Sequence, residues 1–365
     1  IGTSSELCNP NYELEKAAAA VKYGADTVMD LSTSGDLDKI RNSILKAIKV
    51  PLGTVPIYQA EVETIRKNEA MVNMTEDDVF NVVEKHAGDG VDFMTIHAGV
   101  TKQTVEKLKD SSRVTGIVSR GGAFLANWMV YNKKENPLYQ NFDYLLEIAR
   151  KYDFCISLGD ALRPGCLADA SDWFQIQELL TIQKLVEKCW DADVQVMVEG
   201  PGHLPLDHVE VNVILEKKLC KGAPFYVLGP LVTDAGLGYD HIVGAIGGAL
   251  AALYGADFLC YVTPTEHLGL PRIEDVKEGV IAAKIAGHCA DLVKLKEKTM
   301  KVDLEMSLAR AKLDWETQYR ISMDSEKAKK VRERVDLKTG ACSMCGEYCT
   351  YRVFPVKRRG SKPSN

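Results

Sequence analysis

The sequence predicts an α/β protein: a (β/α)8 barrel of the TIM type followed by a small helical C-terminal domain. Short apolar segments recur along the chain, and stretches with a helical spacing of apolar residues separate them. Eight such segments favour a closed barrel over an open sheet, because parallel strands that are apolar throughout need helices on their outer face. A change to Lys- and Glu-rich sequence after residue 296 predicts the second domain.

The expected strands and helices alternate along the chain. We expect strands at 26–29, 52–58, 93–97, 116–119, 154–158, 194–198, 225–228 and 258–262. We expect helices at 12–22, 36–48, 76–87, 142–151, 173–190, 206–221, 239–254, 273–290, 306–319 and 325–335. The pattern therefore predicts a barrel over 1–295, a helical domain over 296–350 and a basic flexible tail over 351–365.

Composition excludes several classes of protein. The 365 residues are 46% hydrophobic and 26% charged, with a net charge of −6, as in an ordinary globular protein. No apolar run reaches the roughly 18–20 residues that span a bilayer, so we expect no membrane partner. The only dense basic stretch, 357–359, is too short to indicate nucleic-acid binding. Most of the ten Cys lie singly in apolar segments, which indicates reduced thiols and a cytoplasmic location.

Polar residues end nearly every expected strand. They are Met29 with Asp30, Tyr58, His97, Ser119, Arg120, Gly121, Asp160, Arg163, Glu199, His203, Tyr226, Glu266 and His267. Singly, each has an ordinary structural explanation, such as a helix cap or a paired core His. Together, at the carboxyl ends of barrel strands, they predict an active site, and they argue against a pure binding module.

Two kinds of ligand follow from these residue types. Arg120 and Arg163, with nearby glycine amides, match the oxygens of a phosphorylated substrate. His203 and His267 suit a single Zn or Fe ion, although two His 64 residues apart are not a specific metal pattern.

The C-terminal domain carries a denser motif. Cys342, Cys345 and Cys349 form a C-x2-C-x3-C pattern with no fourth Cys or His nearby. Three thiolates favour a [4Fe–4S] cluster with one open iron over a zinc site or a redox thiol pair. The alternative is a metal-dependent barrel hydrolase or lyase that uses His203 and His267 and carries the Cys motif as a zinc clip.

These segments resemble one known family. The strings are IGTS (1–4), GADTVMDLST (24–33), GTVPIYQA (53–60), TIHAGV (95–100), TGIVSRGG (115–122), LGDALRPG (158–165), VMVEGPGH (196–203), APFYVLGPLVTD (223–234), YDH (239–241), CYVTPTEHLGLP (260–271) and CSMCGEYC (342–349). They closely resemble the phosphomethylpyrimidine synthases, radical S-adenosylmethionine enzymes of thiamine biosynthesis.

The resemblance implies a homodimer that rearranges 5-aminoimidazole ribotide to the thiamine pyrimidine phosphate, with S-adenosylmethionine and an electron donor. It implies substrate binding by Met29, Tyr58, His97, Ser119, Arg120, Gly121, Asp160, Ala161, Leu162, Arg163, Glu199 and Tyr226. It implies a mononuclear divalent metal, Zn or Fe, on His203 and His267, and a [4Fe–4S] cluster on Cys342, Cys345 and Cys349.

The chain departs from the family pattern in two loops at the mouth of the expected site. Ala161 stands where the family has Gly, and DAGLG at 234–238 stands where it has DIAPG. Both changes alter the allowed backbone angles. A related group of enzymes converts the same ribotide to 5-hydroxybenzimidazole for anaerobic cobalamin synthesis, and this product stays an alternative.

Overall fold

The computed structural model describes residues 1–67, 70–335 and 340–354. They divide into two compact units, residues 1–290 and the residues from 291 onward. The domain boundaries expected from the sequence, at 295 and 350, stay predictions. The predicted tail lies mostly outside the described residues, because 355–365 are not among them.

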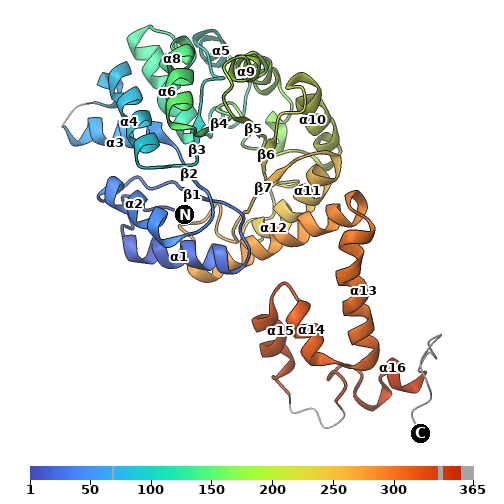
Figure 1. Ribbon diagram of the computed structural model, residues 1–365. Helices are drawn as coiled ribbons and strands as arrows, with labels where there is room; N and C mark the ends of the chain where they lie inside the picture. The colour runs from blue at the N-terminus through green and yellow to red at the C-terminus, as the bar shows by residue number, and fades with distance from the viewer. Residues whose placement is uncertain (68–69, 336–339, 355–365) are drawn as a thin grey trace. The chain divides into compact units, whose positions relative to one another are not determined.

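The first unit contains a parallel sheet of seven strands, each paired with the next strand along the chain. The sheet curls, and helices cover its outer side (Figure 1). The strands are β1 (Val28–Asp30), β2 (Leu52–Thr54), β3 (Phe93–Ile96), β4 (Cys155–Leu158), β5 (Val196–Gly200), β6 (Phe225–Leu228) and β7 (Phe258–Cys260). Because the strands run in one direction, their carboxyl ends meet at one rim.

Helices occupy the crossovers between the strands. They are α1 (Pro10–Lys22), α2 (Leu37–Ala47), α3 (Pro56–Arg66), α4 (Glu76–Gly88), α5 (Lys102–Leu108), α6 (Arg120–Asn132), α7 (Pro137–Gln140), α8 (Phe142–Tyr152), α9 (Trp173–Asp191), α10 (Leu206–Leu219), α11 (Asp240–Tyr254) and α12 (Ile273–Lys294), with short 3-10 turns η1 (Met71–Asn73) and η2 (Leu167–Asp169). Asp36, Thr75 and Asp172 cap three of them by accepting a backbone N–H. Apolar side chains between the helices and the sheet, such as Ile156 and Val198, are fully buried.

The prediction of a strand at 116–119 is wrong. β3 pairs directly with β4, with Ile96 opposite Leu158, so no position for a strand remains between them. Side chains bind the backbone just before this segment: Asp169 accepts N–H groups from Val114 and Thr115 at 2.7 and 2.9 Å. The segment therefore forms a loop that leads into α6. With seven strands, and no pairing of β1 with β7 in the described part of the chain, the closed (β/α)8 barrel is not confirmed.

The predicted strand at 52–58 is too long, because β2 ends at Thr54. Pro56 takes the first position of α3, where its fixed backbone angle and missing N–H are tolerated. Tyr58 therefore lies on the first turn of a helix.

The second unit contains α13 (Glu297–Lys312), α14 (Trp315–Ile321), α15 (Ser325–Arg332), η3 (Gly346–Tyr348) and α16 (Thr350–Val353). The helix predicted at 306–319 is wrong as a single element. Leu313 has a left-handed backbone conformation, with φ at 56°, and Asp314 caps the following helix. The chain therefore turns between α13 and α14.

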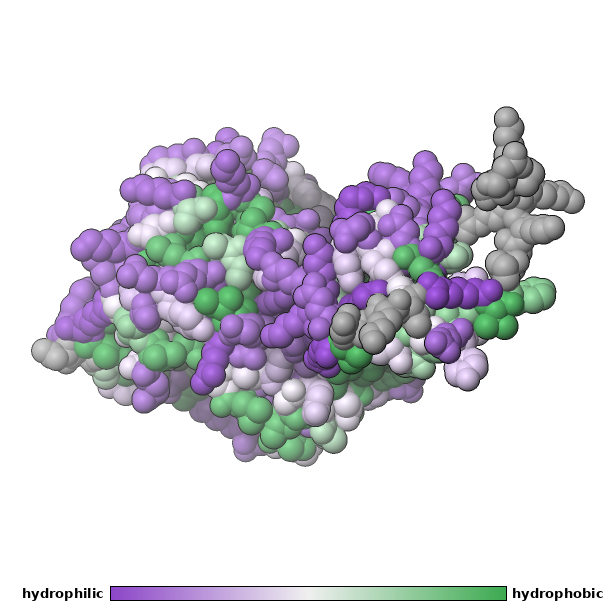
Figure 2. All heavy atoms as spheres, turned by 90° about the horizontal axis from the view of Figure 1, so that it is seen from below, coloured by the Kyte–Doolittle hydropathy of each residue, from purple (hydrophilic) through white to green (hydrophobic). Residues whose placement is uncertain are grey.

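Hydrophilic residues cover most of the face shown in Figure 2, and hydrophobic residues form separate patches. None of the described helices is long and apolar enough to cross a membrane.

Candidate active site

Glu199 brings three strands together at the rim of the sheet. It lies near the end of β5, and its Oε1 accepts hydrogen bonds from Thr95 Oγ1 of β3 at 2.7 Å and from Ser157 Oγ of β4 at 2.8 Å. Burial raises the pKa of the Glu199 carboxyl, which these two hydrogen bonds and Arg163 oppose. The two hydroxyls fix the position of the carboxyl group.

Asp160 and Arg163 lie on the loop after β4. Arg163 Nη1 donates to the carbonyl oxygen and to Oδ1 of Asp160, both at 3.3 Å. Burial raises the pKa of Asp160 to about 8, Arg163 opposes the rise, and Glu199 adds to it. Asp160 Oδ2 is buried and has no hydrogen-bond partner among the described residues. A buried polar atom that lacks a partner needs an explanation, and a bound ligand would supply one.

His97 follows β3 and, like Asp160, has a buried polar atom without a hydrogen-bond partner. Its Nε2 lies 3.0 Å from Ser119 Oγ, whereas its Nδ1 is buried without a partner in the described part of the chain. Burial, then the charge of Arg163, lower the pKa of His97 to about 3, so the ring is neutral. A Cβ on Gly121 would lie 2.6 Å from this Nδ1, so only glycine leaves room for the ring.

Two aromatic side chains contribute to the same rim. The guanidinium carbon of Arg120 lies 5.0 Å from the ring centroid of Tyr58, as in a cation–π contact. Tyr226 on β6 donates from its hydroxyl to Met29 Sδ of β1 at 3.7 Å. This last contact joins β1, at one edge of the sheet, to β6, the strand next to the other edge.

Ala161 and Leu162 lie on the same loop as Asp160 and Arg163. Both side chains are fully buried. A Cβ on Gly122 would lie only 2.8 Å from the Ala161 methyl group, so this part of the loop packs tightly against α6. The two side chains therefore pack this loop, and their part in substrate binding stays a prediction.

His203 and His267 come together although 64 residues separate them. Their ring centroids are 5.4 Å apart. His203 Nδ1 lies 2.8 Å from Asp234 Oδ1, and His267 Nδ1 lies 2.7 Å from Asp240 Oδ1. A carboxylate on Nδ1 selects the tautomer that leaves Nε2 able to bind a metal. The donor set therefore fits a divalent ion, although no group of three His, Cys, Asp or Glu side chains suited to a metal occurs within 1–67, 70–335 and 340–354.

The three Cys of the second unit lie on one short turn around η3. Backbone N–H groups of Cys345 and Met344 hydrogen-bond to the Cys342 sulfur and lower its pKa, which favours the thiolate. Burial, then the neighbouring Cys342, raise the pKa of Cys345. Cys349 is buried. A favoured thiolate suits an iron ligand.

Sequence reasoning missed several residues of this site: Thr95, Ser157, Asp234 and Asp240. Thr95 precedes His97 by two residues, so the two-residue period of a strand places both on one face. That signal was available in the sequence. The two Asp partners of His203 and His267 carry no such spacing, because Asp234 lies on the loop after β6 and Asp240 at the start of α11.

The curved parallel sheet and its rim of buried acids, arginines and His define an α/β enzyme with its site at the carboxyl ends of the strands. Comparison with known proteins identifies the family. The radical SAM ThiC family matches residues 1–355, and the chain belongs to it.

Relatives from three organisms, each named phosphomethylpyrimidine synthase, are similar over nearly the whole chain. The relative from Methanocaldococcus jannaschii is 57% identical over 350 residues, which are 96% of this chain and 82% of that protein. The relative from Pyrococcus furiosus is 58% identical over 353 residues, and that from Geobacter metallireducens is 55% identical over 356, each covering 97% of this chain and 82% of the relative.

Proposed function

We propose that the chain is a phosphomethylpyrimidine synthase, a radical carbon–carbon lyase that converts 5-aminoimidazole ribotide to 4-amino-5-hydroxymethyl-2-methylpyrimidine phosphate for thiamine biosynthesis. The observation that carries the proposal is the match to the radical SAM ThiC family from residue 1 to 355. This match favours radical chemistry over the alternative of a metal-dependent hydrolase.

The rim of the sheet supplies groups that suit a phosphorylated imidazole. Arg120 begins α6, so its guanidinium and the positive end of a 13-residue helix both favour an anion. The neutral His97 and the Asp160 carboxyl each have a buried polar atom to pair with the substrate. Glu199, held by two hydroxyls, provides a further acceptor.

Two bound groups complete the proposed enzyme. His203 and His267 would hold one divalent metal, Zn or Fe, as a Lewis acid, and Cys342, Cys345 and Cys349 would hold a [4Fe–4S] cluster. When bound, the cluster supplies the electron that cleaves S-adenosylmethionine reductively and so starts the rearrangement. The protein orients the ribotide, binds its phosphate and excludes water.

We further propose a cytoplasmic homodimer served by an electron donor. Free thiols and an iron–sulfur cluster both suit a reducing compartment. Exposed apolar side chains on α10 and α11, Val211, Ile214, Ile242, Ile246 and Tyr254, suit a surface buried by a second copy. Light scattering of the full chain would test the dimer, and a monomer at all concentrations would contradict it.

Anaerobic reconstitution with iron and sulfide tests the activity. The loaded protein is incubated with dithionite, S-adenosylmethionine and 5-aminoimidazole ribotide, and the products are identified by mass spectrometry. We expect the pyrimidine phosphate and 5′-deoxyadenosine. 5-Hydroxybenzimidazole instead would assign the chain to the cobalamin branch, and no iron–sulfur absorbance and no product would contradict radical chemistry.

Two variants with one control separate the bound groups. Cys345→Ala should abolish the iron–sulfur absorbance, and His203→Ala should lower the content of mononuclear metal while leaving that absorbance. His208→Ala is the matched control, because His208 hydrogen-bonds to Ser171 and not to the other imidazoles. Equal metal content in His203→Ala and the unchanged protein would refute the metal assignment.

A further inference from the structure

The peptide groups of Leu162 are held from two sides. Leu162 N donates to Glu178 Oε2 at 2.7 Å, and the Leu162 carbonyl oxygen accepts a hydrogen bond from Arg113 Nη2. Leu162 is fully buried and lies between Asp160 and Arg163, two residues of the candidate site. Two side chains from outside the rim therefore hold the centre of the loop that carries Asp160 and Arg163.

Glu178 reaches this loop from α9. The residue is 2% exposed, and a Cβ on Gly99 would lie 2.8 Å from its Cγ, so the loop after β3 leaves room for it only because residue 99 is glycine. Burial, then the charge of Asp160, raise the pKa of Glu178 well above its ordinary range. Glu178 accepts backbone hydrogen bonds from Leu162 and Ala161, which oppose this rise.

Arg113, which donates to the Leu162 carbonyl oxygen, is itself held by contacts with two other residues. Its side chain is fully buried, with Nε 2.9 Å from Asp172 Oδ2 and Nη1 donating to the Gly116 carbonyl oxygen at 3.0 Å. Asp172 also caps α9, the helix that carries Glu178. One helix therefore supplies both the acceptor for the Leu162 N–H and the anchor of the arginine.

We propose that Glu178 and Arg113 are positioning residues that hold the Leu162 peptide groups and so place Asp160 and Arg163 for substrate binding. Neither side chain reaches the rim, so neither is a catalytic residue. The proposal rests on the proposed function only in the choice of ligand, 5-aminoimidazole ribotide.

The consequence for binding follows from the geometry. Glu178→Asp withdraws the carboxyl group by one methylene, so the Leu162 N–H loses its acceptor and the loop shifts. Glu178→Gln keeps an acceptor oxygen at the same distance from the backbone. We expect ribotide to bind about tenfold or more weakly to the Asp variant, and within about twofold of normal to the Gln variant, because displacement by a fraction of an ångström is enough to weaken oriented contacts.

Calorimetric titration of the purified full chain with 5-aminoimidazole ribotide tests this without any need for a loaded cluster. Glu187→Asp is the matched control: it lies on the same helix and pairs with Lys221 at 2.8 Å on the surface. Circular dichroism and the thermal midpoint check that each variant folds, and Arg113→Lys, which loses the guanidinium fork, provides a second test should Glu178→Asp not fold.

The outcomes are distinct. Weak binding by Glu178→Asp and Arg113→Lys, with normal binding by Glu178→Gln and Glu187→Asp, supports the proposal. Equal dissociation constants in all folded variants would overturn it while leaving the proposed function intact. Absence of ribotide binding in the unchanged protein would overturn the substrate assignment and this inference with it.

Discussion

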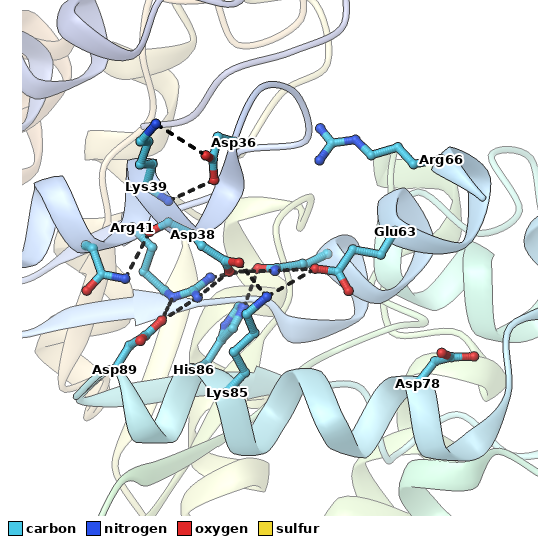
Figure 3. Close-up of polar contacts among 12 residues, drawn as sticks. Asp36, Asp38, Lys39, Arg41, Glu63, Arg66, Asp78, Lys85, His86 and Asp89 are labelled. Atoms are coloured by element: carbon cyan, nitrogen blue, oxygen red, sulfur yellow. Dashed lines mark hydrogen bonds and ion pairs between the residues drawn. The ribbon is translucent and has the colours of Figure 1, made fainter. Parts of the chain in front are cut away.

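Two polar clusters lie in the first unit, and they differ in how completely their hydrogen-bonding groups are paired. One lies between α2, α3 and α4 on the outside of the sheet and is centred on the buried Arg41 (Figure 3). We call it the Arg41 network; it consists of Asp38, Arg41, Gln59, Glu63, Lys85, His86 and Asp89. The other is the candidate site at the rim of the sheet, which includes His97, Asp160, Arg163 and Glu199.

Every buried side-chain nitrogen and oxygen of the Arg41 network has a partner in the described part of the chain. Gln59 uses all four of its positions: Oε1 accepts from Arg41 Nη1 at 2.7 Å and His86 Nε2 at 2.8 Å, and Nε2 donates to Asp38 at 2.8 Å and Glu63 at 2.7 Å. Burial, then the charge of Arg41, lower the pKa of His86. Its Nδ1 lies 2.8 Å from Thr54 Oγ1.

At the rim, by contrast, not every buried polar atom is paired: His97 Nδ1 and Asp160 Oδ2 have no hydrogen-bond partner among the described residues. An unpaired buried polar group costs free energy that folding alone gives no reason to accept. The comparison teaches that a dense set of charges is not by itself an active site. The unpaired atoms distinguish the site from the network.

The largest effect is expected from Arg41→Met. It removes the buried charge at the centre of the network, the donor to Asp89 and one of the donors to Asp38 and to Gln59, which should lower the free energy of unfolding by about 3–5 kcal/mol. Urea denaturation measures the change. Lys39→Met, at an exposed ion pair with Asp36, should have almost no effect, and equal stability of the two variants would break the comparison.

Glu199→Gln should act on activity and not on folding. The amide oxygen still accepts hydrogen bonds from Thr95 and Ser157, so the free energy of unfolding should change by less than about 1 kcal/mol. Removing the acid from the rim should slow product formation by about 100-fold, equivalent to about 2.7 kcal/mol. Glu187→Gln is the control, and an unchanged rate in Glu199→Gln would remove Glu199 from the site.

Asp160→Asn should change how stability depends on pH. Because burial raises the pKa of Asp160 to about 8, the folded protein keeps a proton that the unfolded chain releases above about pH 4. The unchanged protein should therefore lose stability relative to Asp160→Asn, by at least about 1 kcal/mol, as pH rises from 4 to 8. Parallel stability curves from urea melts would show that Asp160 ionises normally.

The smallest effect is expected from Thr75→Ala at the start of α4, the helix that carries Lys85 and His86. Thr75 Oγ1 accepts from Asp78 N at 3.1 Å, and loss of such a cap costs about 1 kcal/mol. The thermal midpoint should fall slightly while the rate of product formation stays the same. A large loss of activity would mean that the outer helices control the rim.

Much of the fold could be predicted because apolar periodicity is local. Seven of the expected strands occur, whereas the one at 116–119 does not, since its apolar residues resemble a strand but Asp169 and Arg113 bind the surrounding backbone. Pro56 signalled that the strand before Tyr58 ends early. Leu313, at a left-handed turn, carried no comparable signal, because such a conformation is uncommon for leucine.

Some residues of the site could be predicted from the sequence and others could not. Residue type and place at a strand end were enough to select His97, Glu199 and His203, and spacing was enough to select the three Cys. Glu178 and Arg113 could not be found in this way, because each acts on a loop distant in sequence. Asp234 and Asp240 could not be found either, because each is distant in sequence from the His that it contacts.

The sequence by itself determined the alternation of strands and helices, the residue types at the rim, the Cys motif and the family. These depend on local periodicity and on the chemistry of single side chains. Only the tertiary structure decided the number of strands, the pairing of His203 with His267, and which buried polar atoms have partners. Hydrogen bonds between distant loops and burial set these features, because both depend on which segments meet after the chain folds.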